Sequence, residues 1–162
     1  MKPLPPAPIP DLAWRWKRFD DLTVHELQNI YMARQTVFGV EQACAYLDAD
    51  GCDDRAFHLS AWSAQERLPL AYARVLDAGV KYAEVSIGRV ITMPAARGIG
   101  LGRELMARVL LHAGQAWPGA AIRISAQSRL ETFYTGLGFQ VVGDRYIEDG
   151  IPHTEMLRAP TG

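Results

Sequence analysis

The sequence predicts an α/β (α+β) fold in which one mixed sheet carries helices on its faces. The predicted elements follow the order β-α-β-β-β-α-β-α-β-β, so hairpins come first and two βα units come after them. The chain has 162 residues, of which 49% are hydrophobic and 22% are charged. This length and composition suit a single packed domain, which we place at residues 12–160. Residues 1–11 hold five of the ten prolines, and we expect them to form a flexible tail.

The first half of the chain indicates a strand, a helix and then three more strands. Residues 12–19 alternate between apolar and mostly basic side chains, which is the period of a strand. Thr23 and Glu26 fit a capping box, and apolar residues at helical spacing follow up to about Gly39. Further strands are predicted at about residues 56–63, 70–77 and 83–92, with turn sequences between them.

The second half adds two helices and three strands. Apolar residues at helical spacing from Leu101 to Ala113 predict a helix that ends before Gly119. Ser128 and Glu131 fit a second capping box, which would open a helix running to about residue 137. Strands are expected at about residues 121–126, 139–142 and 154–158.

The charge balance excludes several classes of partner. Seventeen basic residues face eighteen acidic ones, a net charge of −1, whereas nucleic acid or an anionic membrane rewards a basic excess. No apolar run approaches the length of a membrane span, the N-terminus lacks a secretory signal, and Cys44 and Cys52 give no disulfide framework. We therefore expect a cytoplasmic protein that uses neither nucleic acid nor a membrane as its partner.

The acidic segment after the first predicted helix does not fit a metal site. Asp48-Ala-Asp50-Gly51 begins like a calcium loop, but its glycine is at the fourth position rather than the sixth, and position twelve is Leu59. The two cysteines and His58 also lack paired metal-ligand spacing. We predict no metal, and interpret residues 41–54 as an acidic wall that would attract a cationic amine.

A glycine cluster between a predicted strand and a predicted helix needs a chemical explanation. Three of the fourteen glycines are at positions 98, 100 and 102. Such a loop lets a ligand approach the backbone N–H groups at the positive end of the helix dipole, where pyrophosphate binds well. A nucleotide P-loop would require Gly-Lys-Ser/Thr, but Arg103 follows Gly102 here, and the third glycine of a dinucleotide fingerprint is absent. A glycine-rich turn without a ligand remains the alternative.

Two motifs, which follow one another along the chain, resemble the signature motifs of the Gcn5-related N-acetyltransferase (GNAT) superfamily. Arg97-Gly-Ile-Gly100-Leu-Gly102 is similar to its acetyl-CoA motif, and Phe133-Tyr-Thr-Gly-Leu-Gly-Phe139 is similar to its second signature. Four further segments resemble the ElaA-like subgroup, namely 40–42, 46–51, 87–91 and 148–153. The resemblance implies a mostly antiparallel sheet of about six to seven strands with helices on both faces. It also implies direct transfer of an acetyl group from acetyl-CoA to an amine of a small molecule or peptide.

The resemblance also implies roles for individual residues. Tyr134 would be the general acid toward the CoA sulfur, and Glu84 would be the general base, with Glu41, His58 and His153 as competitors. Acetyl-CoA would contact Val90, Ile91, Thr92, Arg97, Gly98, Ile99, Gly100, Leu101, Gly102, Arg103, Gln127 and Phe133. The acceptor would contact Glu41, Asp50, Arg89 and His153.

Each role has a structural alternative. Tyr134 could be a core aromatic residue, Gln127 a polar residue beside a helix, and Glu84 an exposed carboxylate at a strand start. Arg89 lies centrally in a predicted strand, so its guanidinium needs a carboxylate from Glu41, Asp48 or Asp50 if it is buried. At the level of the whole protein, the alternatives are a catalytically silent CoA-binding or partner-binding module and an enzyme for longer acyl groups. A homodimer through the first or the last strand is also left open.

Overall fold

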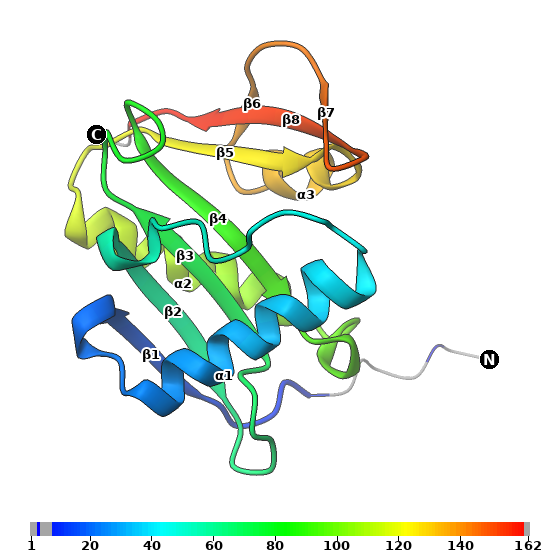
Figure 1. The fold of residues 1–162 in the computed structure, drawn as a ribbon. Helices are drawn as coiled ribbons and strands as arrows, with labels where there is room; N and C mark the ends of the chain where they lie inside the picture. The colour runs from blue at the N-terminus through cyan, green and yellow to red at the C-terminus, as the bar shows by residue number, and fades with distance from the viewer. Residues whose placement is uncertain (1–2, 4–7, 161–162) are drawn as a thin grey trace.

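A computed structural model describes residue 3 and residues 8–160 of the chain. It contains an eight-stranded sheet in the order β1-β2-β3-β4-β5-β8-β6, with β7 also paired to β8 (Figure 1). β4 and β5 are parallel, and the other paired strands are antiparallel. The predicted single mixed, mostly antiparallel sheet is therefore confirmed, with one strand more than expected.

The strands are β1 (Ala13–Arg18), β2 (Ala56–Trp62), β3 (Ala71–Leu76), β4 (Val85–Thr92), β5 (Ile122–Gln127), β6 (Gln140–Val141), β7 (Tyr146–Glu148) and β8 (Ile151–Arg158). The α-helices are α1 (Val24–Arg34), α2 (Leu101–Ala116) and α3 (Glu131–Thr135), and α1 continues as the π-helical segment η2 (Gln35–Glu41). Short 3₁₀ turns are η1 (Phe19–Asp21), η3 (Asp53–Arg55), η4 (Pro94–Ala96) and η5 (Ser128–Leu130).

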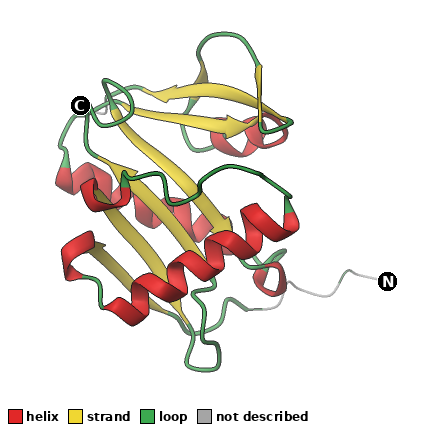
Figure 2. Cartoon of the chain, viewed as in Figure 1, coloured by secondary structure: helices red, strands yellow, loops and turns green. Residues whose placement is uncertain are grey.

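Helices cover both faces of the sheet, with α1 in front and α2 behind it in Figure 2. All six residues of β3 are buried, because side chains alternate between the two covered faces. Ala73 and Val75 belong to the core cluster that includes the buried side chains of α2, whereas Tyr72 packs with Ile30 and other residues of the α1 face. Arg74 shares the α1 face, so the fold must supply carboxylates to a buried guanidinium there.

The two predicted capping boxes have different outcomes. The first is confirmed in part: Thr23 Oγ1 accepts a hydrogen bond from the Glu26 backbone N–H at 3.0 Å. The second is wrong, because the Ser128 hydroxyl lies 2.7 Å from Thr154 Oγ1 instead of capping the helix, and the Glu131 carboxylate binds Arg145. The segment therefore begins as η5, and α3 is only five residues long.

The additional strand, β7, was not predicted, and it forms a hairpin with the last strand, β8. β7 pairs with β8 through Glu148 and Ile151, and the two turn residues Asp149 and Gly150 have φ angles of +51° and +75°. Asp-Gly with positive φ at both positions is a preferred two-residue hairpin turn. This dipeptide was the available signal, and it also explains why β8 begins at Ile151 rather than near Thr154.

The ends of the sheet and of the chain bear on two other predictions. β1 is an edge strand, whereas β8 lies between β5 and its other partners and offers no free edge, so the dimer prediction concerns β1 alone. Residues 1–2 and 4–7 of the predicted tail lie outside the described residues, while residues 8–11 are exposed and belong to no helix or strand. Among the helices of the described ranges, none has the length and apolarity of a membrane span.

Candidate active site

β4 and β5 begin as partners and then separate. They pair only between Val85–Ile87 and Ile122–Ile124, although β4 continues to Thr92 and β5 to Gln127. Figure 1 shows the two strands moving apart. A cavity of about 340 Å³ lies beside this divergence and is lined by residues of both strands. The open edge of β4 leaves backbone N–H and C=O groups without a strand partner, so an extended ligand that carries amides can pair with them.

An irregularity in β4 directs Arg89 toward this cavity. The register between β3 and β4 shifts between Tyr72 and Arg74, and Arg89 has a φ of +51°. Arg89 Nε lies 2.9 Å from Asp48 Oδ1, and its Nη2 donates to Asp50 Oδ2 at 3.3 Å. The prediction that a carboxylate pairs with Arg89 is therefore confirmed, and two aspartates contribute to this pairing.

A buried ion network fixes the segment between η2 and β2 across the face of the sheet. Arg34 binds Asp48 and Asp53, each at 2.8 Å, and Arg74 binds Asp50 at 2.7 Å and Asp53 at 3.2 Å. Burial raises the pKa of Asp53, but the hydrogen bonds and charges of the two arginines outweigh it and lower this pKa overall. Asp48, Asp50 and Asp53 of the acidic wall are thus already paired with arginines within the protein.

His58 lies behind this network and is fully buried. Its Nδ1 is 2.7 Å from the Tyr72 hydroxyl, and its Nε2 is 2.8 Å from the Asp53 carbonyl oxygen. A carbonyl can only accept, so Nε2 carries the proton and Nδ1 accepts from Tyr72. Burial lowers the pKa of His58, which keeps the ring neutral and makes it a structural group.

We expect His58 to make the fold sensitive to mild acid. Its pKa is lower in the folded state than the ordinary value of 6.5, so the unfolded state binds the extra proton first. The free energy of unfolding should therefore fall as pH drops below about 6.5. His58→Gln keeps a donor and an acceptor but cannot titrate. Urea unfolding of both proteins at pH 7 and pH 5 should show a smaller decline for the variant, and equal declines would contradict the assignment.

Tyr134 meets the cavity from α3. Its side chain is largely buried, packs edge-on against Phe133 and Phe139, and lines the cavity. Burial raises the pKa of Tyr134 to about 12, so the phenol keeps its proton at neutral pH. A protonated hydroxyl at a polar cavity can donate to a leaving group. Phe133 packs against the hydrophobic core beside it.

The glycine loop has the backbone expected of an anion site. Gly98 and Gly100 have φ angles of +80° and +87°, and Gly100 is the N-cap of α2, whose first N–H groups receive no side-chain cap. Arg103 is exposed and has no ion pair within the described residues. Arg97 instead donates to the Thr92 carbonyl at 3.1 Å and pairs with Glu41 at 2.9 Å. This loop lies outside the lining of the 340 Å³ cavity.

The structure places the four base candidates in different surroundings. Glu84 binds Arg123 with both carboxylate oxygens, at 2.9 and 3.1 Å, and these hydrogen bonds lower the pKa of Glu84. Glu41 is held by Arg97, and both ring nitrogens of His58 are occupied. Within the described part of the chain, His153 is the one candidate of the four that lines the cavity.

Several cavity residues were not selected from the sequence. Gln42 Oε1 accepts from Gln127 Nε2 at 3.0 Å, a contact between the segment after η2 and the end of β5. The Ser125 hydroxyl contacts the Tyr146 hydroxyl, which β7 brings to β5. These partners are distant in the sequence, and only the Tyr146 contact depends on the pairing of β7 with β8 and of β8 with β5. Other unselected lining residues include Cys44, Tyr46, Tyr82, Ser86 and Arg129.

Comparisons with known proteins agree with this geometry. Residues 53–159 match the family described as acetyltransferase (GNAT) domain. A protein of Synechocystis called UPF0039 protein sll0451 is 40% identical over 147 residues, which cover 91% of this chain and 95% of that protein. Protein ElaA of Escherichia coli is 38% identical over 150 residues, covering 91% and 96% of the two chains.

Solved structures are similar over nearly the same span. An acyl-CoA N-acyltransferase from Pseudomonas aeruginosa superposes with a TM-score of 0.87 at 42% identity, covering 92% of this chain and all of that one. Escherichia coli ElaA superposes with a TM-score of 0.85 at 36% identity, covering 91% and 99% of the two chains. The similarity therefore extends over nearly the whole chain.

Proposed function

The chain belongs to the GNAT acetyltransferase family and its ElaA-like subgroup, and from that premise we propose that it transfers an acetyl group from acetyl-CoA to an amine. The acceptor amine is carried by a small molecule or a peptide. The observation that carries the proposal is the open edge of β4 facing a cavity that Tyr134 lines. A cytoplasmic single domain at residues 12–160 is part of the same proposal.

The donor is proposed to lie along β4 and over the start of α2. Its pantetheine arm carries amides, which suit the backbone of Val90, Ile91 and Thr92 where β4 has left β5. Its pyrophosphate suits the N–H groups from Gly98 to Arg103, at the positive end of the α2 dipole. Ile99 and Leu101 pack into the core below this loop, and Gln127 reaches the cavity from β5.

The reaction is a direct attack by the acceptor nitrogen on the thioester carbonyl carbon. The carbon–nitrogen bond forms, the carbon–sulfur bond breaks, and sulfur leaves with the electron pair. Tyr134 supplies a proton to that sulfur, a role that its raised pKa and its position at the cavity support. Arg89 and Asp50 line the acceptor side, where their mutual pairing fixes the shape of the wall.

Two measurements, made one after the other, test the proposed function. Calorimetry with CoA and acetyl-CoA should show binding, and absence of binding at millimolar ligand would refute the proposal. A panel of amines, polyamines and peptides should then reveal CoA release by at least one acceptor class. Binding without release for every acceptor would favour the catalytically silent module instead.

Gly100→Val is expected to weaken CoA binding by about tenfold or more, which corresponds to ~1.4 kcal/mol. A β-branched residue is strained at a φ of +87°, so the loop must move and its N–H groups lose their alignment. The matched control is Gly119→Val, at a φ of +73° beyond the other end of α2. Calorimetry should show unchanged CoA affinity for the control, and equal losses in both variants would contradict a phosphate seat at Gly100.

A further inference from the structure

We infer that His153 is the group that takes a proton from the acceptor amine and that Glu148 stabilises the charge His153 then gains. The inference rests on the proposed function, because it concerns the acceptor half of the same reaction. An amine is protonated in neutral water and must lose a proton before its nitrogen can attack. The site therefore needs a base with a free lone pair that opens on the cavity.

The hydrogen bond of His153 defines which nitrogen is free. Its Nδ1 lies 2.7 Å from the carbonyl oxygen of Ile151. A carbonyl oxygen accepts and cannot donate, so the proton of the neutral ring is on Nδ1. The lone pair is then on Nε2, and the same bond fixes the orientation of the ring. Orientation by a backbone carbonyl is how a histidine is set up to act as a base.

Strand pairing brings His153 to the place where β4 and β5 separate. It is opposite Gln127, the last residue of β5, and opposite Tyr146 of β7. The rings of Tyr146 and His153 stack with centroids 5.9 Å apart, which limits rotation of the imidazole. His153 and Tyr134 both line the cavity, so a base and an acid serve the same space.

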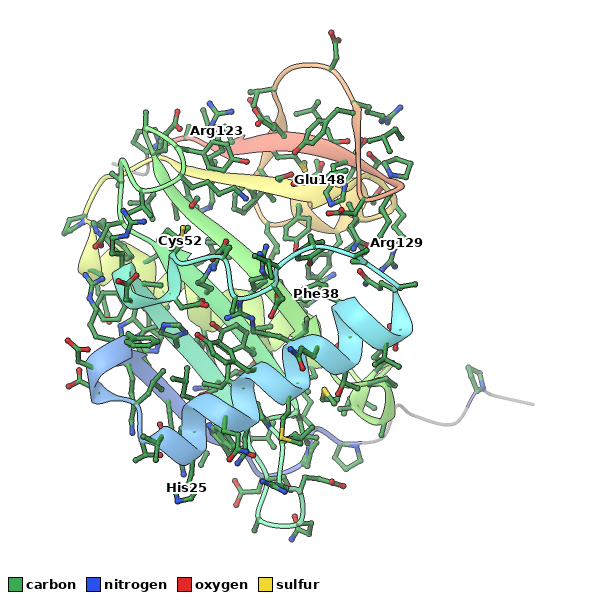
Figure 3. The ribbon with its side chains drawn as sticks, in the orientation of Figure 1. His25, Phe38, Cys52, Arg123, Arg129 and Glu148 are labelled. Carbon is green, nitrogen blue, oxygen red and sulfur yellow. The ribbon has the colours of Figure 1, made fainter. Side chains whose placement is uncertain are left out.

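The charged groups around His153 come from two segments. Glu148 Oε2, on β7, is 3.9 Å from Nε2, and Asp149 at the hairpin tip also lines the cavity. Arg129 follows β5 and lines the cavity too, with its Nε donating to Gln127 Oε1 at 3.0 Å. Figure 3 labels Glu148 and Arg129 in these two segments. The carboxylate of Glu148 is thus placed to pair with an imidazolium that forms during the reaction.

The proton balance can be written for each group. His153 Nε2 takes one proton from the ammonium form of the acceptor and passes it to solvent. After the acceptor nitrogen has attacked, that nitrogen loses a second proton. Tyr134 gives its own hydroxyl proton to the sulfur and is reprotonated by the proton that the nitrogen releases. The products are the amide, CoA as a thiol and one proton released to water. No oxidant or further reactant is required.

The test compares two amines of similar size and different basicity. Ethylamine is almost wholly protonated at pH 7, whereas 2,2,2-trifluoroethylamine is largely neutral. His153→Gln should lower kcat/KM for ethylamine by about 10²-fold and for trifluoroethylamine by less than tenfold. Raising the pH should restore the activity of the variant toward ethylamine. His25→Gln, at an exposed position on α1 (Figure 3), should leave both rates unchanged. Glu148→Gln should reduce the ethylamine rate by a smaller factor than His153→Gln.

Equal losses for the two amines, or no rescue at high pH, would overturn the assignment of His153. A long-range ¹H–¹⁵N spectrum provides a readout that is independent of turnover. It should show the neutral ring of His153 protonated at Nδ1, and a proton on Nε2 would overturn the inference. Failure of the proposed function is distinguishable, because it is an absence of CoA binding, or of CoA release with every acceptor, in the wild-type protein and does not alter this spectrum.

Discussion

Replacing Tyr134 by phenylalanine is expected to lower kcat by about 10²-fold or more while CoA affinity stays the same. The hydroxyl is the atom that is lost, and the ring that packs against Phe133 and Phe139 remains. A thiolate that leaves without a proton is stabilised only by its surroundings, so bond breaking slows. Steady-state CoA release and calorimetry on the same preparations would separate the effect on turnover from the effect on binding.

Tyr31→Phe is the matched control for this substitution. The Tyr31 hydroxyl lies 3.3 Å from Asp53 Oδ2 in the ion network, and the residue is outside the cavity lining. Its loss should leave kcat unchanged and cost about 1 kcal/mol of stability. If Tyr134→Phe bound CoA and turned over at the wild-type rate, Tyr134 would be a core aromatic residue, which was its structural alternative.

Replacing Asp53 by asparagine is expected to lower the free energy of unfolding by about 3 kcal/mol. Asp53 is 3% exposed and accepts from both Arg34 and Arg74, so the neutral amide leaves excess positive charge in a buried region. Urea unfolding at pH 7 measures the loss. We expect the substitution to perturb the cavity as well, because the network holds the segment that forms one wall of the cavity.

Asp54→Asn provides a control one residue away. The Asp54 side chain is 64% exposed and lies 3.9 Å from Arg55, so its charge is screened by water. Its effect on unfolding should stay within about 0.5 kcal/mol. A loss of similar size for the two variants would show that the backbone of η3, rather than the buried pairing of Asp53, determines stability here.

Periodic segments made most of the fold predictable from the sequence. Residues 12–19 and the strands of the central sheet alternate clearly, and α2 has a continuous apolar face from Leu101 to Ala113. The prediction of secondary structure failed where a side chain bonds to a residue that is distant in the sequence. Ser128 bonds to Thr154 of β8 instead of its own helix, and no local pattern could reveal that choice.

The candidate site, too, was predictable only where its residues are contiguous in the sequence. The glycine loop and Tyr134 were visible as motifs because they are contiguous in the sequence. The surroundings of Glu84 and His153 could not be predicted from the sequence. Sheet pairing brings Arg123 to Glu84 and the β7–β8 hairpin to His153. Sequence spacing placed Glu84 near the motif strand correctly, but it could not show that an arginine already held both of its oxygens.

The placement of Arg74 on a strand buried on both faces has an evolutionary consequence. Its charge is matched by Asp50 and Asp53, and Asp53 is shared with Arg34. Single changes among these residues expose an unmatched buried charge, so their effects are strongly non-additive. Sequence drift at these buried positions of the acidic wall and its arginine partners must therefore pass through paired substitutions, and they should diverge more slowly than the exposed loops nearby.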